Sequence, residues 1–175
     1  MKFMKKWGAL VLVLAVLMGL LGGLMWITSR PVVLKAAELT AVEPTESYPE
    51  CQLSLGISHG RIRSAVFQNE STQSFYHGDP PDYSGLEVCL NGVWYHVPHR
   101  EYATAGEGKV TGPGENFSFE PVLSPYGKLP NGQYRLSFGY WQEDLDKNEP
   151  ITQQAFFVSY APFEIQNGQY VLPRS

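Results

Sequence analysis

At residues 126–135 the sequence reads Tyr-Gly-Lys-Leu-Pro-Asn-Gly-Gln-Tyr-Arg. Gly127 and Gly132 permit a positive φ, which a tight corner needs. Pro130 fixes its own φ and favours extended geometry in the residue before it. Every second residue of the run 134–140 is large and apolar, which is typical of a strand with one buried face. The stretch therefore predicts a sharp corner that leads directly into a strand.

A Leu-Pro-x-Gly-x-Tyr corner before a strand is typical of the tyrosine corner of immunoglobulin-like sandwiches. In this corner the tyrosine ring is buried, and its hydroxyl bonds to the backbone a few residues upstream. We expect Tyr134 to play that part. The residues with predicted structural roles in the corner are Tyr126, Gly127, Leu129, Pro130, Gly132 and Tyr134.

A hairpin is the second strong local signal. Asn91 and Gly92 separate two apolar runs, 86–90 and 93–97, and an Asn-Gly loop of two residues fits a type I′ turn. Trp94 follows the turn, and we assign Asn91, Gly92 and Trp94 structural roles. About seven short strands, divided by turns and without a soluble helix, predict an all-β fold, an immunoglobulin-like antiparallel β-sandwich.

One strand of this sandwich has an ambiguous pattern. In residues 61–68 either Ile62 and Val66 or Ala65 and Phe67 form the inward face, because the apolar residues do not alternate strictly. The sequence leaves these two alternatives open.

The N-terminus carries a targeting signal. Lys2, Lys5 and Lys6 precede an uncharged stretch, 7–29, which is long enough for a transmembrane helix and longer than the apolar core of a secretory signal usually is. We expect an uncleaved signal anchor that leaves residues 1–6 in the cytoplasm and the rest outside. The alternative is a cleaved signal peptide and a secreted product.

The remaining chain then divides into three parts. Residues 30–50 combine spread prolines with glutamates and lack periodicity, so we predict a flexible linker. The immunoglobulin-like domain covers residues 51–166, and residues 167–175 form a C-terminal tail or a short hairpin.

Four motifs resemble a bacterial immunoglobulin-like domain family. They are the hairpin Leu-Glu-Val-Cys-Leu-Asn-Gly-Val-Trp-Tyr-His-Val-Pro at 86–98, the strand start Pro-Gly-Glu-x-x-x-Phe at 113–119, the corner at 126–135, and the closing strand at 157–165. The resemblance covers residues 51–166 and rests on the order and spacing of these elements. It implies an exported, membrane-anchored or lipid-anchored protein of Gram-positive type, with no enzymatic activity and no catalytic residues to carry over.

The amino-acid composition argues against nucleic acid as a partner. The formal net charge is −4, and several of the basic residues lie before residue 36, so the predicted domain lacks the basic surface that nucleic acids require. We expect no nucleic-acid binding and no cofactor. The expected partners are the membrane, through residues 7–29, and an envelope protein or glycan.

Two sets of residues offer an enzymatic alternative. Gly-Ile-Ser-His-Gly at 56–60 matches a nucleophile elbow by letters and would use Ser58 and His59, although an elbow needs a helix after the strand. Three histidines, His77, His96 and His99, would suit a metal-dependent activity. We expect instead a non-enzymatic domain with a binding or structural role at the cell envelope.

The two cysteines, Cys51 and Cys89, leave a further choice. An exported domain allows a disulfide between them. Against it, Cys89 shares a strand face with Glu87, whereas Cys51 shares one with Leu53 and Leu55. The alternatives are one disulfide or two free thiols.

Overall fold

The computed structural model describes Val16, Met18 and residues 32–78, 84–100, 108–142 and 155–173. The chain divides into two compact units, Met1–Val32 and Val33–Ser175. Val16 and Met18 are helical, and both side chains are exposed. Within the described ranges no helix is long and apolar enough to cross a membrane. Apart from Val16 and Met18, the anchor predicted at 7–29 lies outside those ranges, as do residues 1–6.

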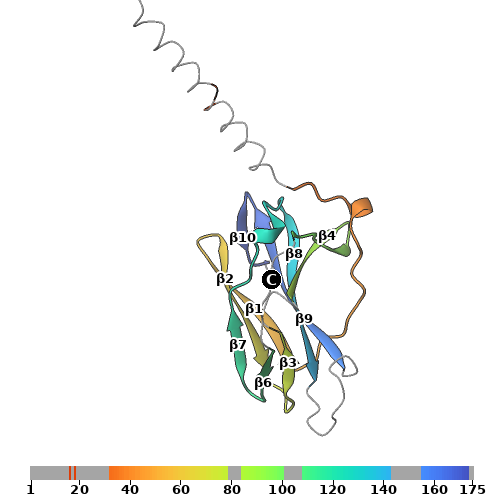
Figure 1. The fold of residues 1–175 in the computed structure, drawn as a ribbon, viewed down its shortest axis with the longest axis vertical. Coiled ribbons are helices and arrows are strands. Elements are labelled where there is room, and N and C mark those ends of the chain that lie inside the picture. Colours follow the sequence, from red (N-terminus) through yellow and green to blue (C-terminus); the bar gives the residue numbers. More distant parts are fainter. Residues whose placement is uncertain are drawn as a thin grey trace, which may run out of the picture. The chain divides into compact units, whose positions relative to one another are not determined.

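The second unit is all-β, with two antiparallel sheets (Figure 1). The small sheet has the order β1 (Cys51–Ser58), β2 (Arg61–Asn69) and β7 (Asn116–Phe119). The large sheet contains β3 (Phe75–His77), β4 (Ser84–Leu90), β5 (Val93–His96), β6 (Lys109–Thr111), β8 (Gly132–Gln142), β9 (Phe156–Gln166) and β10 (Gln169–Val171). The described residues thus form ten strands where about seven were predicted, and three of them, β3, β6 and β10, have only three residues each.

Strand β8 is the centre of the large sheet. Strand β9 pairs with it from Gly132 to Trp141 on one side. On the other side β4 pairs with the first half of β8, and β3 pairs with its end. Strand β5 continues the sheet beyond β4. The outer face of the large sheet is the face turned away from the small sheet. Around β8 it is built from four strands, β5, β4, β8 and β9.

The sheets pack face to face through a shared aromatic core. Phe67 of β2 lies 5.0 Å from Phe138 and 4.7 Å from Tyr140 of β8, measured between ring centroids, and all three rings are fully buried. Alternate residues of a strand point to opposite faces, so Phe138 and Tyr140 face the core while Ser137 and Gly139 face outward. This two-sheet packing agrees with the predicted β-sandwich.

A β-bulge decides the ambiguous face of the second strand. The pairing of β1 with β2 shifts between Gly56 and Ile57, because Gly56 pairs with Ser64 whereas Ile57 pairs with Ile62. The extra residue, Arg63, changes which face the following side chains occupy. Ile62 is therefore buried at one end of the strand, and Ala65 and Phe67 are buried at the other. Each predicted alternative was right for one half of the strand.

The corner before β8 has the predicted hydrogen bond. The Tyr134 hydroxyl donates to the carbonyl oxygen of Pro130 at 2.9 Å, and the tyrosine is 1% exposed. Burial, with a smaller effect of the nearby Tyr170, raises the pKa of Tyr134 to about 12, so the hydroxyl keeps the proton that it donates. Tyr126, which ends the 3-10 helix η2 (Ser124–Tyr126), and Leu129 are buried beside it.

The two corner glycines differ. Gly127 has a φ of 69°, as expected. Gly132 does not have a positive φ, so the prediction for it was wrong. Gly132 is already the first residue of β8 and pairs with Ile165, and a strand requires extended geometry.

We expect Tyr134→Phe to lower the free energy of unfolding by about 1–3 kcal/mol, because the Pro130 carbonyl loses a buried donor. Thermal unfolding of the wild type and the variant measures this. An unchanged melting temperature would mean that the hydroxyl does not hold the corner.

Two turns follow their sequence signals. Asn91 and Gly92 have φ values of 54° and 81°, as a type I′ turn between β4 and β5 requires. Asn167 and Gly168 also have positive φ, and they connect β9 to β10. The C-terminal residues 167–171 therefore form a short hairpin, which was one of the two predicted alternatives.

The segment 33–50, which we call the strap, lies against the large sheet. Close to its start it contains the 3-10 helix η1 (Ala36–Glu38). Val42 N donates to Trp94 O at 2.9 Å, and His96 N donates to Thr40 O at 3.0 Å, so the strap pairs with the free edge of β5. Farther along, Val158 N of β9 donates to Glu46 O at 3.0 Å. The strap thus crosses from β5 to β9 over the outer face of the sheet. In Figure 1 it is the orange trace that passes β4.

The structure here differs from the predicted flexible linker. The strap is held by backbone hydrogen bonds and by a few separated apolar side chains that pack against buried residues of the domain. These side chains are Leu34, Leu39 and Tyr48. The Tyr48 ring lies 5.0 Å from Phe75 and 5.3 Å from Phe157. Such contacts leave no periodic pattern in the sequence, which is why the segment resembled a linker.

Candidate functional site

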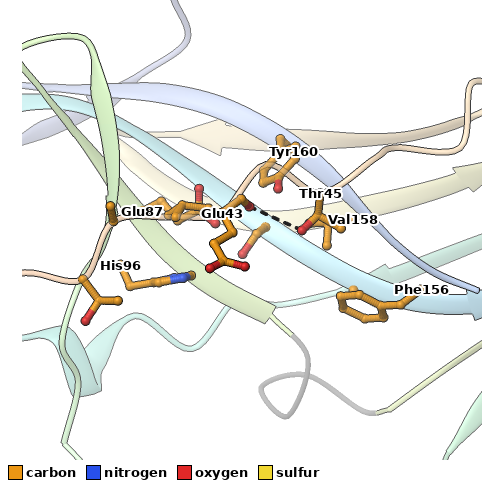
Figure 2. A pocket seen from close by; sticks show the side chains of 12 residues that line it. Glu43, Thr45, Glu87, His96, Phe156, Val158 and Tyr160 are labelled. Carbon is orange, nitrogen blue, oxygen red and sulfur yellow. Dashed lines mark hydrogen bonds between the residues drawn. The ribbon is translucent and has the colours of Figure 1, made fainter. Parts of the chain in front are cut away.

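A pocket of about 420 Å³ lies between the strap and the outer face of the large sheet (Figure 2). Its floor includes Ser137 and Gly139 of β8, which face outward because their neighbours face the core. These two residues are small, and the strap crosses above them without filling the space. Val158 and Tyr160 of β9 complete the floor.

One wall of the pocket is Glu87 of β4, a carboxylate that is only 2% exposed. Its cross-strand neighbour is Arg135, whose Nε donates to Glu87 Oε2 at 2.5 Å. The guanidinium carbon of Arg135 lies 4.3 Å from the Trp94 ring and 3.8 Å from the Tyr160 ring. Four strands therefore fix this ion pair, and the cation–π contacts hold the arginine in one position.

Arg135 bonds to one of the two carboxylate oxygens of Glu87. Among the residues that the structure describes, no donor makes a hydrogen bond to Glu87 Oε1. Buried carboxylate oxygens usually accept a hydrogen bond, either from the protein or from water. A ligand in the pocket could supply the missing donor.

Tyr160 contributes a neutral phenol. Burial raises the pKa of Tyr160, and the nearby Glu87 carboxylate raises it further. Arg135 and a hydrogen bond with Thr45 act in the opposite direction. The phenol stays protonated at neutral pH and can serve as a hydrogen-bond donor.

The charges around the pocket favour cations over anions. Its lining contains two carboxylates, Glu43 of the strap and Glu87 of the sheet, together with His96 of β5. Figure 2 shows Glu43 and His96 turned into the hollow beside the strap. Lysine and arginine are absent from the described lining, and Arg135 behind Glu87 already has its carboxylate partner.

The residues of the predicted enzymatic alternative are scattered. Ser58 ends β1, and His59 lies in the tight turn to β2 with a φ of 50°, so a strand and not a helix follows the serine. His77 lies in the core, whereas His96 faces the outside. Within the described ranges, no group of three histidine, cysteine, aspartate or glutamate side chains could hold a metal ion.

His77 has a structural environment. It is fully buried, and its Nδ1 lies 3.1 Å from Gly78 O while its Nε2 lies 2.8 Å from the Thr111 hydroxyl. A carbonyl oxygen only accepts, so Nδ1 carries a proton and donates it to Gly78 O. The Phe117 and Phe138 rings lie 4.4 Å and 5.1 Å from the imidazole.

His96 and His99 are the two histidines that the structure brings together. Both line a second hollow, of about 350 Å³, beside Glu38 of the strap. His99 also bonds through Nδ1 to the Arg100 carbonyl at 3.1 Å and lies against the Tyr126 ring.

Both cysteines are free thiols, so the disulfide alternative was wrong. Cys51 is buried between the sheets, whereas Cys89 faces outward on β4 opposite Trp94. The two thiols therefore lie on different sides of the large sheet. Burial raises the pKa of Cys51 to about 11, with a small further rise from Glu50 and an opposing hydrogen bond from Tyr140.

We expect a thiol reagent at pH 8 to label one cysteine, Cys89, in the native protein and both cysteines in denaturant without reductant. Only roughly 0.1% of Cys51 is thiolate at that pH, and the thiolate is the reactive form, so its labelling accelerates as pH rises toward about 11. Mass spectrometry identifies the labelled residues. Failure to label either residue after unfolding would indicate a disulfide.

Sequence reasoning assigned no site role to Glu87, Arg135 or Glu43. Glu87 and Arg135 each lie on the polar side of an alternating strand, and this signal is present in the sequence. Their partnership depends on β4 pairing with β8 in one register, which no local motif specifies. Glu43 lies in the strap, whose contacts were not predicted.

Scans against protein-family models, curated proteins and solved structures found no match for this chain.

Proposed function

We propose that this chain is a membrane-tethered protein that presents an immunoglobulin-like domain outside the cytoplasm and acts there by binding, without catalysing a reaction. The charge pattern before residue 7 and the uncharged stretch 7–29 support the tether and its orientation. The tyrosine corner at Tyr134 and the two-sheet core support the immunoglobulin-like class within the all-β fold.

The observation that carries the proposal is the pocket beneath the strap. It combines carboxylates, hydroxyl groups and apolar side chains around a hollow of ligand size. A serine and a histidine, Ser137 and His96, line it, but the Ser137 hydroxyl lies 3.2 Å from both the N and the O of Gly85. No hydrogen bond joins Ser137 to His96, so the histidine is not placed to activate the serine.

A photo-crosslinking amino acid at position 156 tests the binding function in cells that make the protein. Phe156 lines the pocket and is 43% exposed, and Val122, which does not line it, is also 43% exposed and serves as the matched control. We expect an adduct of discrete mass from position 156 and none from position 122. Equal adducts, or none at position 156, would contradict a binding role for the pocket.

The tether is tested separately. The full chain should stay in the membrane fraction after alkaline carbonate extraction, and protease added outside intact cells should remove the β-domain. Release by carbonate would argue for a cleaved, secreted product, and protection from protease would contradict the proposed orientation.

A further inference from the structure

We propose that the pocket beneath the strap binds a primary ammonium group carried on a short aliphatic arm. This inference rests on the proposed binding function and names the chemical class of the ligand. Two carboxylates line the hollow, Glu43 from the strap and Glu87 from β4. Both carboxylates would repel an anionic ligand, and the described lining contains no lysine or arginine to attract one.

Glu87 provides the main evidence for a bound cation. Arg135 uses Oε2, and Oε1 has no protein donor in the described part of the chain, although the residue is only 2% exposed. A charged donor at Oε1 would complete the coordination of this carboxylate. Glu43 is exposed on the strap and has no ion pair among the described residues, so its charge is also available.

The geometry favours ammonium over other organic cations. An ammonium has three donors on one compact atom, which matches a lining that offers two carboxylates and several hydroxyl groups. A guanidinium prefers both oxygens of one carboxylate, and Arg135 already occupies one of those on Glu87. A quaternary ammonium has no donor, and the Tyr160 face is covered by Arg135.

The rest of the lining suits a short carbon chain. Val42, Phe156 and Val158 supply apolar surface beside the polar groups. The volume of about 420 Å³ exceeds that of a four-carbon arm, so water or a larger carrier would share the hollow. A bound ammonium would also join the strap to the sheet, because its two carboxylate partners belong to different elements.

Titration of the full-length protein in mild detergent with n-butylammonium tests the inference. We expect saturable amide chemical-shift changes at Val42, Gly139 and Val158, with a dissociation constant in the millimolar range. n-Butanol, which has the same arm without charge, and butyrate should bind much more weakly. A second titration uses Nα-acetyl-lysine methylamide. Saturable shift changes at the same amides would identify a lysine side chain as the source of the ammonium, whereas binding of butylammonium alone would identify small free amines.

Two strap variants provide matched controls. Glu43→Gln should weaken butylammonium binding about 2–5-fold, the scale of an exposed ion pair. Glu46→Gln removes the same charge from the same strap outside the pocket lining, and it should leave the affinity unchanged. Equal losses in both variants, equal binding of n-butanol, or no shift at any tested concentration would overturn the ammonium proposal. In each of these cases the adduct at position 156 would still decide whether the pocket binds a ligand of another class.

Discussion

Replacing Arg135 with alanine is expected to lower the free energy of unfolding by about 3–5 kcal/mol, because Glu87 would remain buried without its counter-charge. The Glu87 side chain is only 2% exposed and that of Arg135 only 18%, so solvent screens the unpaired charge poorly. The variant also removes the contacts of the guanidinium with Trp94 and Tyr160. Urea unfolding followed by fluorescence measures the change.

Two controls separate this effect from a general loss of charge. Lys35→Ala breaks the ion pair between Lys35 and Glu38, whose two side chains are 63% and 61% exposed. It should lower the free energy of unfolding by less than about 1 kcal/mol. The double variant Glu87→Leu with Arg135→Leu removes both charges and should recover much of the stability. If Arg135→Ala were as mild as Lys35→Ala, the ion pair would not hold the outer face of the sheet.

Phe138→Ala is expected to lower the free energy of unfolding by about 3–5 kcal/mol, because it leaves a cavity where the two sheets meet. The ring is fully buried on β8 and lies 5.0 Å from Phe67 of the small sheet and 5.3 Å from Phe119 of β7. Phe156→Ala, at a position that is 43% exposed, should change the stability by less than about 1 kcal/mol. Urea unfolding of both variants provides the comparison.

A double-mutant cycle of Phe67→Ala and Phe138→Ala tests whether the sheets share this core. We expect a coupling of about 0.5–3 kcal/mol, because the two rings touch across the sandwich. Strictly additive effects would show that the rings do not contribute to one common core.

The features that the sequence predicted well are those decided by local chemistry. Asn91-Gly92 produced a tight hairpin because both residues accept a positive φ. The corner formed around Tyr134 because its hydroxyl reaches a carbonyl only four residues upstream. The immunoglobulin-like class and the export of the domain stay predictions.

The features that escaped prediction depend on distant pairing. The inward face of β2 changes at Arg63 because β1 and β2 shift their register, and no pattern within β2 specifies that shift. The strap is held through backbone atoms of Thr40, Val42 and Glu46, which any sequence can offer. The pocket therefore became visible only once the strap and the sheet were placed together.

The central claim is that the strap lies on the outer face of the large sheet and closes a pocket there. Amide hydrogen exchange at Val42, His96 and Val158 tests it most directly, because these three N–H groups donate across the contact between strap and sheet. We predict that all three exchange much more slowly than in an unfolded chain, like the amide of Tyr170, which donates to Gly60 elsewhere in the domain. Exchange of Val42, His96 and Val158 at unfolded-chain rates, with Tyr170 still protected, would contradict the account.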